Sequence, residues 1–391
     1  MATASPPAQP ASAQHPSFGV RLHRFWQRVT EGLEVSQLWS QFENEARASY
    51  RLYSRDVAAK TPEGLTKRGH RLHVVKAFFW AVLEKLSPAR RVLLLAALIM
   101  LVFPSSGFSY RGSGNELHVV ELDFHFWGGL LLFMLLILEI ADRVVMKRDL
   151  QIAREIQTWL LPGAPPQIPG ISLAYTTRPA NTVAGDYYDV FPRPGKTQEE
   201  NRVVFAVADV AGKSIPAAML MATFQASLKT LSTAQVALPE LVANMNKYAC
   251  SNSQGGLRFT TAFLAEYDAP SRVFNYINAG HNNPILRRSD GSIERLDVGG
   301  LPLGIQLEAK YDSASVTLAP GDWLIIFTDG LVEAENARQE EYGETRLLGA
   351  IAANAAATPT DMLKRLMAEV DLFVGSTPQH DDVTCLLVKA E

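Results

Sequence analysis

Four aspartates stand where apolar runs of the chain meet turns: Asp186 in AGDYYDVF, Asp209 in VVFAVADVAGKS, Asp329 in WLIIFTDGLVEA and Asp381 in QHDDVTCLLV. Strand ends are stiff, so carboxylates placed there can be held at fixed distances from one another. Carboxylate oxygens suit hard cations such as magnesium or manganese better than zinc. The pattern therefore predicts a metal centre, provided that the fold brings the four side chains together.

Each aspartate also has a structural alternative. Asp329-Gly330 is a favoured turn dipeptide. Asp381 and its neighbour Asp382 could form a solvated loop, and Asp186 could cap the segment that follows it. The GKS tripeptide that ends at Ser214 does not make a phosphate-binding loop, because that motif needs a glycine where this chain has Val207.

The charge of the chain is unevenly distributed. Residues 1–91 carry 14 Lys and Arg against 7 Asp and Glu, a net of +7, whereas residues 92–391 carry 23 against 33, a net of −10. A basic block beside apolar segments is more typical of a membrane-proximal region than of a nucleic-acid binder. Cys250 and Cys385 have neither metal-type nor disulfide-type spacing, which fits a reducing compartment.

Two apolar segments predict a membrane hairpin over residues 89–141. The charge-free stretches are 19 residues after Arg91 and 15 residues after Asp123, and a spanning helix needs about 20 apolar residues. Basic residues flank the pair, so the positive-inside rule predicts a multi-pass inner-membrane protein with both termini in the cytoplasm. A buried helical hairpin in a soluble domain is the alternative. Residues 1–18 are expected to be disordered and residues 19–88 to be helical with an open role.

Residues 142–162 predict a linker helix that ends before Pro162. Val145, Ile152 and Trp159 recur every seven residues, which gives a narrow apolar stripe suited to pairing with a second copy. Packing of this stripe onto the next domain is an equal alternative. Prolines then mark a domain boundary.

Residues 166–391 predict one α+β domain. Several expected strands are separated only by short turns, such as Ser289-Asp290-Gly291 and Pro320-Gly321-Asp322, so many pairs must be antiparallel. The expected strands are ISLAYTT, RVVFAVADV, TTAFLAEYD, RVFNYINA, SVTLA, DWLIIFTDG and VTCLLVKA, and the expected helices are 215–231, 238–249, 344–355 and 360–373.

From about Leu150 the chain resembles the SpoIIE-type (sporulation stage II protein E-like) branch of the PPM family of metal-dependent protein serine/threonine phosphatases, which are protein phosphatase 2C-like. The matching motifs occur in order: LQIAREIQTWLLP, RPANTVAGDYYDV, ADVAGKSIPAAMLMA, FTTAFLAEYD, INAGHNNPIL, GLPLGI, GDWLIIFTDGLVEA, YGETRL and HDDVTCLLV. The resemblance implies an α-β-β-α sandwich of two antiparallel sheets flanked by helices, with two manganese or magnesium ions at one edge.

The resemblance also implies roles for individual residues. Asp209 would bridge both ions, and the backbone carbonyl of Val210 would bind one of them. Asp329 and Asp381 would hold the second ion, and Asp186 would complete the set. A water activated by the ions would attack phosphorus, so no Cys or His nucleophile is required.

The chain departs from the family pattern at several positions. Ala211 stands where the eukaryotic branch has a histidine that is a candidate general acid, and Ser214 and Ala184 each replace a glycine. No arginine has the eukaryotic phosphate-clamp spacing, so Arg178 is a candidate for phosphate contact, with a structural ion pair as the alternative.

Four further polar residues are left open by the sequence. His281 and Asn282 could approach substrate, or His281 could be a structural histidine. Asp189 and Asp382 are expected to support the site or to be solvated.

The resulting hypothesis is a membrane-anchored, metal-dependent protein phosphatase. Its expected partners are a phosphoprotein, by resemblance an anti-sigma-factor antagonist, together with membrane lipid and a second copy bound through the linker helix, but no nucleic acid. The linker would transmit a signal to the helices after Asp209. An inactive phosphatase-like module that binds a partner is the alternative, although four uncompensated carboxylates would repel one another without cations. A membrane receptor acting mainly through its basic N-terminal region is compatible with the first hypothesis.

Overall fold

The computed structural model describes residues 86–104, 106–111, 117–195, 202–253 and 255–391, together with Trp80 and Leu83. The chain divides into two compact units, Met1–Ala141 and Asp142–Glu391, which are described separately. The predictions for residues 1–18 and for nearly all of residues 19–88 lie outside the described residues.

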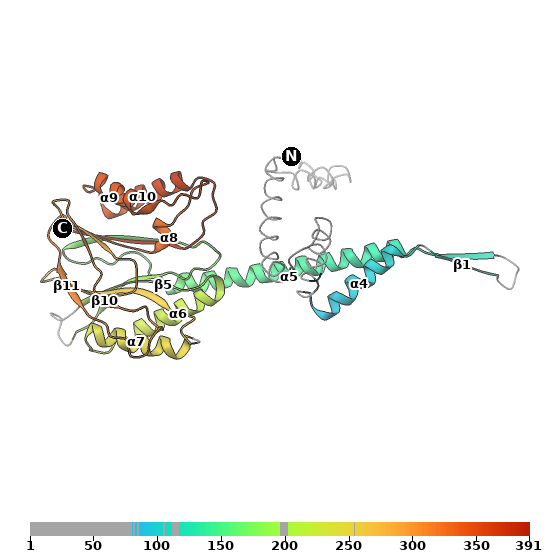
Figure 1. The fold of residues 1–391 in the computed structure, drawn as a ribbon, viewed down its shortest axis with the longest axis horizontal. Coiled ribbons are helices and arrows are strands. Elements are labelled where there is room, and N and C mark those ends of the chain that lie inside the picture. The colour runs from blue at the N-terminus through green and yellow to red at the C-terminus, as the bar shows by residue number, and fades with distance from the viewer. Residues whose placement is uncertain are drawn as a thin grey trace, which may run out of the picture. The chain divides into compact units, whose positions relative to one another are not determined.

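In the first unit, a helix and a hairpin precede a long helix. Helix α4 spans Pro88–Val102, strands β1 (Ser106–Arg111) and β2 (Leu117–Leu122) pair antiparallel, and helix α5 spans Phe124–Leu160 (Figure 1). Ala97 of α4 is buried. An added Cβ at Gly128 of α5 would lie only 3.0 Å from the Ala97 carbonyl oxygen, so the absence of a side chain allows the close approach of the two helices.

The prediction of a two-pass membrane hairpin over residues 89–141 is wrong. No helix in the described part of the chain has both the length and the apolar character that crossing a membrane requires. Helix α4 has 15 residues, a length of about 22 Å at about 1.5 Å per residue, whereas the hydrocarbon core is about 30 Å thick. Residues 106–110, which end the charge-free stretch after Arg91, lie in strand β1 instead. The predicted multi-pass inner-membrane location is therefore also wrong.

The second unit contains two facing sheets, as predicted. A six-stranded sheet has the order β10-β7-β6-β5-β4, with β11 also paired to β7, and a five-stranded sheet has the order β3-β13-β12-β8-β9. All these pairs are antiparallel except β10 with β7. The strands are β3 (Ile171–Arg178), β4 (Tyr187–Arg193), β5 (Arg202–Val210), β6 (Thr260–Asp268), β7 (Val273–Ala279), β8 (Ile285–Arg287), β9 (Ile293–Arg295), β10 (Gly299–Gly300), β11 (Ala314–Thr317), β12 (Trp323–Phe327) and β13 (Val383–Ala390).

Helices cover the outer faces of both sheets. The helices are α6 (Ser214–Leu231), α7 (Leu238–Asn252), α8 (Asp329–Val332), α9 (Gly343–Ala353) and α10 (Pro359–Val374). Helices α6 and α7 lie against the six-stranded sheet and α9 and α10 against the five-stranded sheet (Figure 1). The α-β-β-α arrangement is therefore confirmed, and the expected helix ranges differ from the observed ones by a few residues at most.

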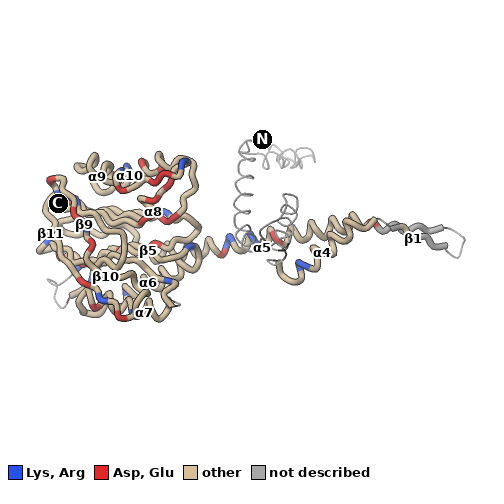
Figure 2. Tube along the Cα trace, viewed as in Figure 1, with Lys and Arg blue, Asp and Glu red and all other residues tan. Residues whose placement is uncertain are grey.

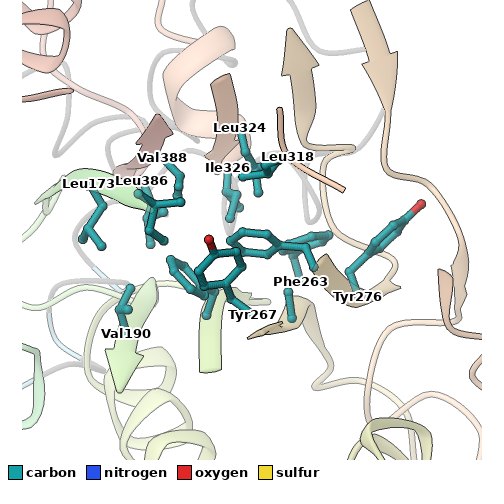
Figure 3. Close-up of a cluster of buried hydrophobic side chains, with 14 of the residues drawn as sticks. Leu173, Val190, Phe263, Tyr267, Tyr276, Leu318, Leu324, Ile326, Leu386 and Val388 are labelled. Atoms are coloured by element: carbon teal, nitrogen blue, oxygen red, sulfur yellow. The ribbon is translucent and has the colours of Figure 1, made fainter. Parts of the chain in front are cut away.

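Alternation along the strands builds three apolar layers. In β5, Phe205 and Val207 belong to the cluster between the sheets, whereas Ala206 and Ala208 pack with α6 and α7. This is the two-residue period of a strand, whose successive side chains point to opposite faces. The central cluster joins residues such as Leu324, Ile326 and Leu386 of one sheet to Phe263 and Tyr267 of the other (Figure 3).

Two predicted turns are confirmed, whereas one strand was not predicted. Gly291 and Gly321 have φ of +94° and +88°, as the predicted turns require. Strand β4 was not predicted, because its sequence YYDVFPR contains a proline and an aspartate, which weaken a strand pattern. It nevertheless pairs along its full length with β5.

The central cluster predicts a contrast between two leucines. Leu386→Ala removes a fully buried side chain from between the sheets and should cost about 2–5 kcal/mol of unfolding free energy. Leu372→Ala makes the same change at a side chain that is 85% exposed on α10 and should stay within about 0.5 kcal/mol of the unaltered protein. Chemical unfolding of the full chain measures both, and equal losses would contradict the layered packing.

Candidate active site

Two antiparallel strand pairs bring the four predicted aspartates to one edge of the sandwich. Asp186 directly precedes β4, and Asp209 lies near the end of β5, with which β4 pairs. Asp329 opens α8 just after β12, and Asp381 lies just before β13, which pairs with β12. Each sheet thus contributes two carboxylates. Figure 2 shows acidic residues close to α8 and α10.

A threonine of one sheet holds the aspartate of the other. Thr328 Oγ1 donates to Asp186 Oδ2 over 2.9 Å and accepts from the backbone N–H of Thr384 at 3.0 Å. Asp186 is only 2% exposed. Burial, and then the charge of Asp209, raise the pKa of Asp186 well above its ordinary value.

The remaining carboxylates also repel one another. Burial first, and then the charges of Asp329, Asp381 and Asp382, raise the pKa of Asp209 to about 7. Burial and the charge of Asp381 likewise raise the pKa of Asp329. The raised pKa values show that too little positive charge surrounds these carboxylates to stabilise their ionised forms. A bound divalent cation would supply that charge.

The type of ligand fits magnesium or manganese, but the present spacing of the side chains does not hold an ion. In the described part of the chain, no three His, Cys, Asp or Glu side chains are grouped closely enough to bind a metal. Lys213 Nζ lies 3.0 Å from Asp381 Oδ2 and supplies a positive charge there instead. The electrostatics favour a cation, and binding one requires side-chain rearrangement.

Glycine 185 leaves room beside a backbone oxygen of this edge. An added Cβ at Gly185 would lie 3.2 Å from the Val210 carbonyl oxygen and 3.2 Å from Cβ of Ala217. These contacts are tighter than ordinary van der Waals contact, so a side chain at position 185 would crowd the carbonyl that the sequence predicts as a ligand.

Comparison with known proteins agrees with this fold. Residues 199–391 match the family described as stage II sporulation protein E (SpoIIE). The chain contains a SpoIIE-family, PP2C-like phosphatase domain. Its fold is similar to the SiaA-PP2C domain of Pseudomonas aeruginosa, with a TM-score of 0.54 and 19% identity, covering 64% of this chain and 99% of that one.

Two curated relatives are similar in sequence to the part of this chain that includes the SpoIIE-family domain. Phosphoserine phosphatase RsbU of Bacillus subtilis is 27% identical over 247 residues, which cover 62% of this chain and 70% of RsbU. Protein IcfG of Synechocystis is 26% identical over 277 residues, which cover 64% of this chain. The match spans only 42% of the length of IcfG.

Asp382 positions the loop of Asp186 in the SpoIIE-family domain. Its two carboxylate oxygens accept the backbone N–H groups of Ala180 at 2.7 Å and Gly185 at 2.6 Å. An added Cβ at Gly330 would lie 2.1 Å from the Asp382 carbonyl oxygen, so only glycine fits there. The Asp-Gly and Asp-Asp dipeptides therefore pack against each other, and Asp382 supports the site rather than being solvated.

Arg178 forms a structural ion pair, which was the alternative to a phosphate contact. Its Nη2 lies 3.2 Å from Asp371 Oδ2, and its Nη1 donates to Asp371 Oδ1.

Asp189 is also structural: it accepts a hydrogen bond of 2.6 Å from the Tyr187 hydroxyl and pairs with Lys229 Nζ at 2.7 Å. This pair of a half-exposed lysine with a buried aspartate ties α6 to β4.

His281 lies behind the site and not at its mouth. It is 5% exposed, and its Nδ1 lies 3.0 Å from Oγ1 of Thr261, the residue paired with Asp209 across β5 and β6. Burial lowers the pKa of His281 to about 4, so the ring is neutral at neutral pH. Its neighbour Asn282 is half-buried.

Gln157 is a site residue that the sequence did not reveal. Its side-chain amide donates to the Ala184 carbonyl at 2.7 Å and accepts from the Ala184 N–H at 2.9 Å. These two hydrogen bonds attach the end of α5 to Ala184, which lies two residues before Asp186 in the chain. A glutamine on a helix carries no pattern that would predict such a contact.

The raised pKa of Asp209 gives a prediction about pH. An acid whose pKa is higher in the folded protein favours folding below its unfolded pKa of about 4 and loses that contribution as the pH rises through about 7. Without divalent cations, the unfolding temperature of the unaltered chain should fall relative to that of Asp209→Asn between pH 5 and 8. The exposed Asp312→Asn is the matched control. Parallel profiles for Asp209→Asn and the unaltered chain would contradict this electrostatic account.

Proposed function

We propose that this chain is a divalent-cation-dependent protein serine/threonine phosphatase. The observation that carries the proposal is the convergence of Asp186 and Asp209 from one sheet with Asp329 and Asp381 from the other, with the pKa of three of them raised. The SpoIIE-family match and the similarity to a protein named phosphoserine phosphatase support the same reaction.

In this proposal, five residues hold two ions, either manganese or magnesium. Asp209 would contact both ions, the Val210 carbonyl would be a ligand of one, and Asp329 and Asp381 would hold the other, with Asp186 completing the set. When bound, the ions lower the pKa of water to form a nucleophile and neutralise charge on the phosphoryl oxygens. Thr328 and Asp382 keep the carboxylates and their loops in place.

The side chains of the site leave water as the nucleophile. Cys385 is fully buried within β13, and burial raises the pKa of its thiol to about 12, so it stays protonated. His281 is neutral and buried behind Asp209, so it does not face a phosphoester. With Ala211 in place of a candidate general acid, the serine alkoxide that leaves takes its proton from water.

The proposed substrate is phosphoserine or phosphothreonine on a regulatory protein. RsbU and RsbP of Bacillus subtilis are both named phosphoserine phosphatases, and RsbP is 22% identical over 190 residues. By the family resemblance, the substrate class is an anti-sigma-factor antagonist. The charged surroundings of Asp381 suit a polar protein segment better than an apolar ligand.

Hydrolysis of p-nitrophenyl phosphate by the full chain tests the reaction. We expect activity only with added manganese or magnesium, and a loss of at least about 100-fold in kcat/KM for Asp209→Asn, which is about 2.7 kcal/mol of transition-state stabilisation. Asp312→Asn should keep full activity. Hydrolysis that persists with chelator, or that survives Asp209→Asn, would refute the metal-dependent mechanism.

An inactive module that binds a partner is the second candidate. It is favoured by the observation that the described side chains do not form a ready ion site. This alternative predicts no hydrolysis of p-nitrophenyl phosphate or of a phosphoserine peptide at any manganese concentration.

The linker end of α5 is proposed to control the site through Gln157. The apolar stripe of Val145, Ile152 and Trp159 is exposed, while Gln157 bonds to Ala184. One side of the helix therefore contacts the phosphatase domain, and pairing of the exposed stripe with a second copy stays a prediction.

Loss of the Gln157 contact should weaken cation binding. Gln157→Ala frees the segment before Asp186, and loss of such supporting groups typically costs about 10–100-fold in metal affinity. The manganese concentration for half-maximal activity should rise accordingly. Gln151→Ala, at an exposed position of the same helix, is the matched control. An unchanged manganese dependence for Gln157→Ala would show that the contact is only structural.

A further inference from the structure

Given the proposed function, one group is still missing from the site: a side chain that binds the phosphoryl oxygens of the substrate. A cavity of about 450 Å³ adjoins Asp381 and is the place where such a group would act. Arg178 and Lys213 are the Lys and Arg residues that line this cavity among the described residues. The contacts of these two residues distinguish between them.

Arg178 is held away from this role by its own partner. Both terminal nitrogens of its guanidinium group donate to the carboxylate of Asp371 on α10. A two-point pair of this kind fixes the position of the side chain and uses the pair of N–H donors that would otherwise bind a phosphate.

Lys213 sits directly on a predicted metal ligand. Its Nζ lies 3.0 Å from Asp381 Oδ2 and donates to the His380 carbonyl oxygen over 2.7 Å. The side chain is 57% exposed, and its charge also opposes those of Asp329 and Glu333. Gly212, with φ of +121°, turns the backbone just before it, so Lys213 stands between the end of β5 and the start of α6.

The pair of Lys213 with Asp381 can be exchanged easily. An exposed ion pair of a flexible lysine contributes little to stability, so either partner can take another charge at small cost. Lys213 contacts Oδ2 of Asp381, and Oδ1 accepts the Asp382 N–H at 2.9 Å, so a cation that binds Oδ2 takes the place of Lys213. The released ammonium is then within one side-chain length of the ion site and carries up to three donors for phosphoryl oxygens.

We propose that Lys213 is the phosphate-binding residue of this site and that it exchanges between Asp381 and a phosphoryl oxygen of the substrate. In the cation-free protein it neutralises Asp381. With a cation at Asp381, it donates to the phosphoryl group and supplies the contact for which no clamp arginine is present. This inference rests on the proposed phosphatase function and assigns the phosphate contact within it.

Three variants of the full chain test the assignment. Lys213→Met removes the charge and keeps most of the side-chain stem, and Lys213→Arg keeps the charge. Lys247→Met changes an exposed lysine on α7 and is the matched control. Inorganic phosphate is the probe: its binding to the manganese-loaded chain is measured by calorimetry, and manganese binding is measured separately without phosphate. Thermal unfolding checks that each variant is folded.

We expect Lys213→Met to weaken phosphate binding by about 10–100-fold, the range for loss of a charge-assisted hydrogen bond. It should also bind manganese more tightly than the unaltered chain, because Asp381 is no longer paired. KM for a phosphoserine peptide should rise more than kcat falls, Lys213→Arg should recover most of the phosphate affinity, and Lys247→Met should change neither affinity.

Phosphate binding by folded Lys213→Met within about twofold of the unaltered chain would overturn the assignment. If Lys213→Met does not fold, a loss of phosphate affinity in Lys213→Arg as large as that expected for Lys213→Met would overturn it instead, and retention would support it. The failure of the proposed function is a separate result: the unaltered chain would hydrolyse no phosphoester, whereas phosphate binding could still depend on Lys213.

Discussion

Hydrophobic packing between two sheets forces like charges together. The cluster of Phe205, Val207, Leu324 and Leu386 fixes the distance between the sheets, and that distance determines how close Asp186 and Asp209 lie to Asp329 and Asp381. Repulsion and burial raise the pKa values of three of these carboxylates, so their ionised forms are disfavoured where the fold places them. Packing of the core therefore holds repelling carboxylates together at one edge of the sandwich, and a bound cation would reduce this repulsion.

Hydrogen bonds across the two sheets keep this edge in register. Thr328 joins the end of β12 to Asp186, and Asp382 holds the loop before Asp186 from the start of β13. Gln157 adds a third restraint from the linker helix. Each restraint acts on the same short segment, residues 180–186. That segment is consequently the point where the linker and both sheets can influence the carboxylates.

Much of the fold could be predicted because strands and helices leave periodic patterns in the sequence. The alternation in RVVFAVADV and the helical pattern of residues 360–373 each appear in the structure nearly as expected. Strand β4 was not predicted, since Asp189 and Pro192 weaken its own pattern and its pairing with β5 appears only in the fold. The membrane hairpin was predicted from apolar composition, but the helices of the described chain do not meet the requirement for a span. Apolar composition alone does not distinguish a spanning helix from other apolar helices.

By itself, the sequence determined the types of residue available for chemistry and the strand ends that carry them: four aspartates, only two cysteines, and the motifs of a SpoIIE-type domain. Only the tertiary structure decided which neighbours each of them meets. Arg178 became a partner of Asp371, Lys213 a partner of Asp381, and Gln157 a clamp on Ala184. These pairs join residues 27 to 193 positions apart, and local periodicity carries no information about contacts made over such separations.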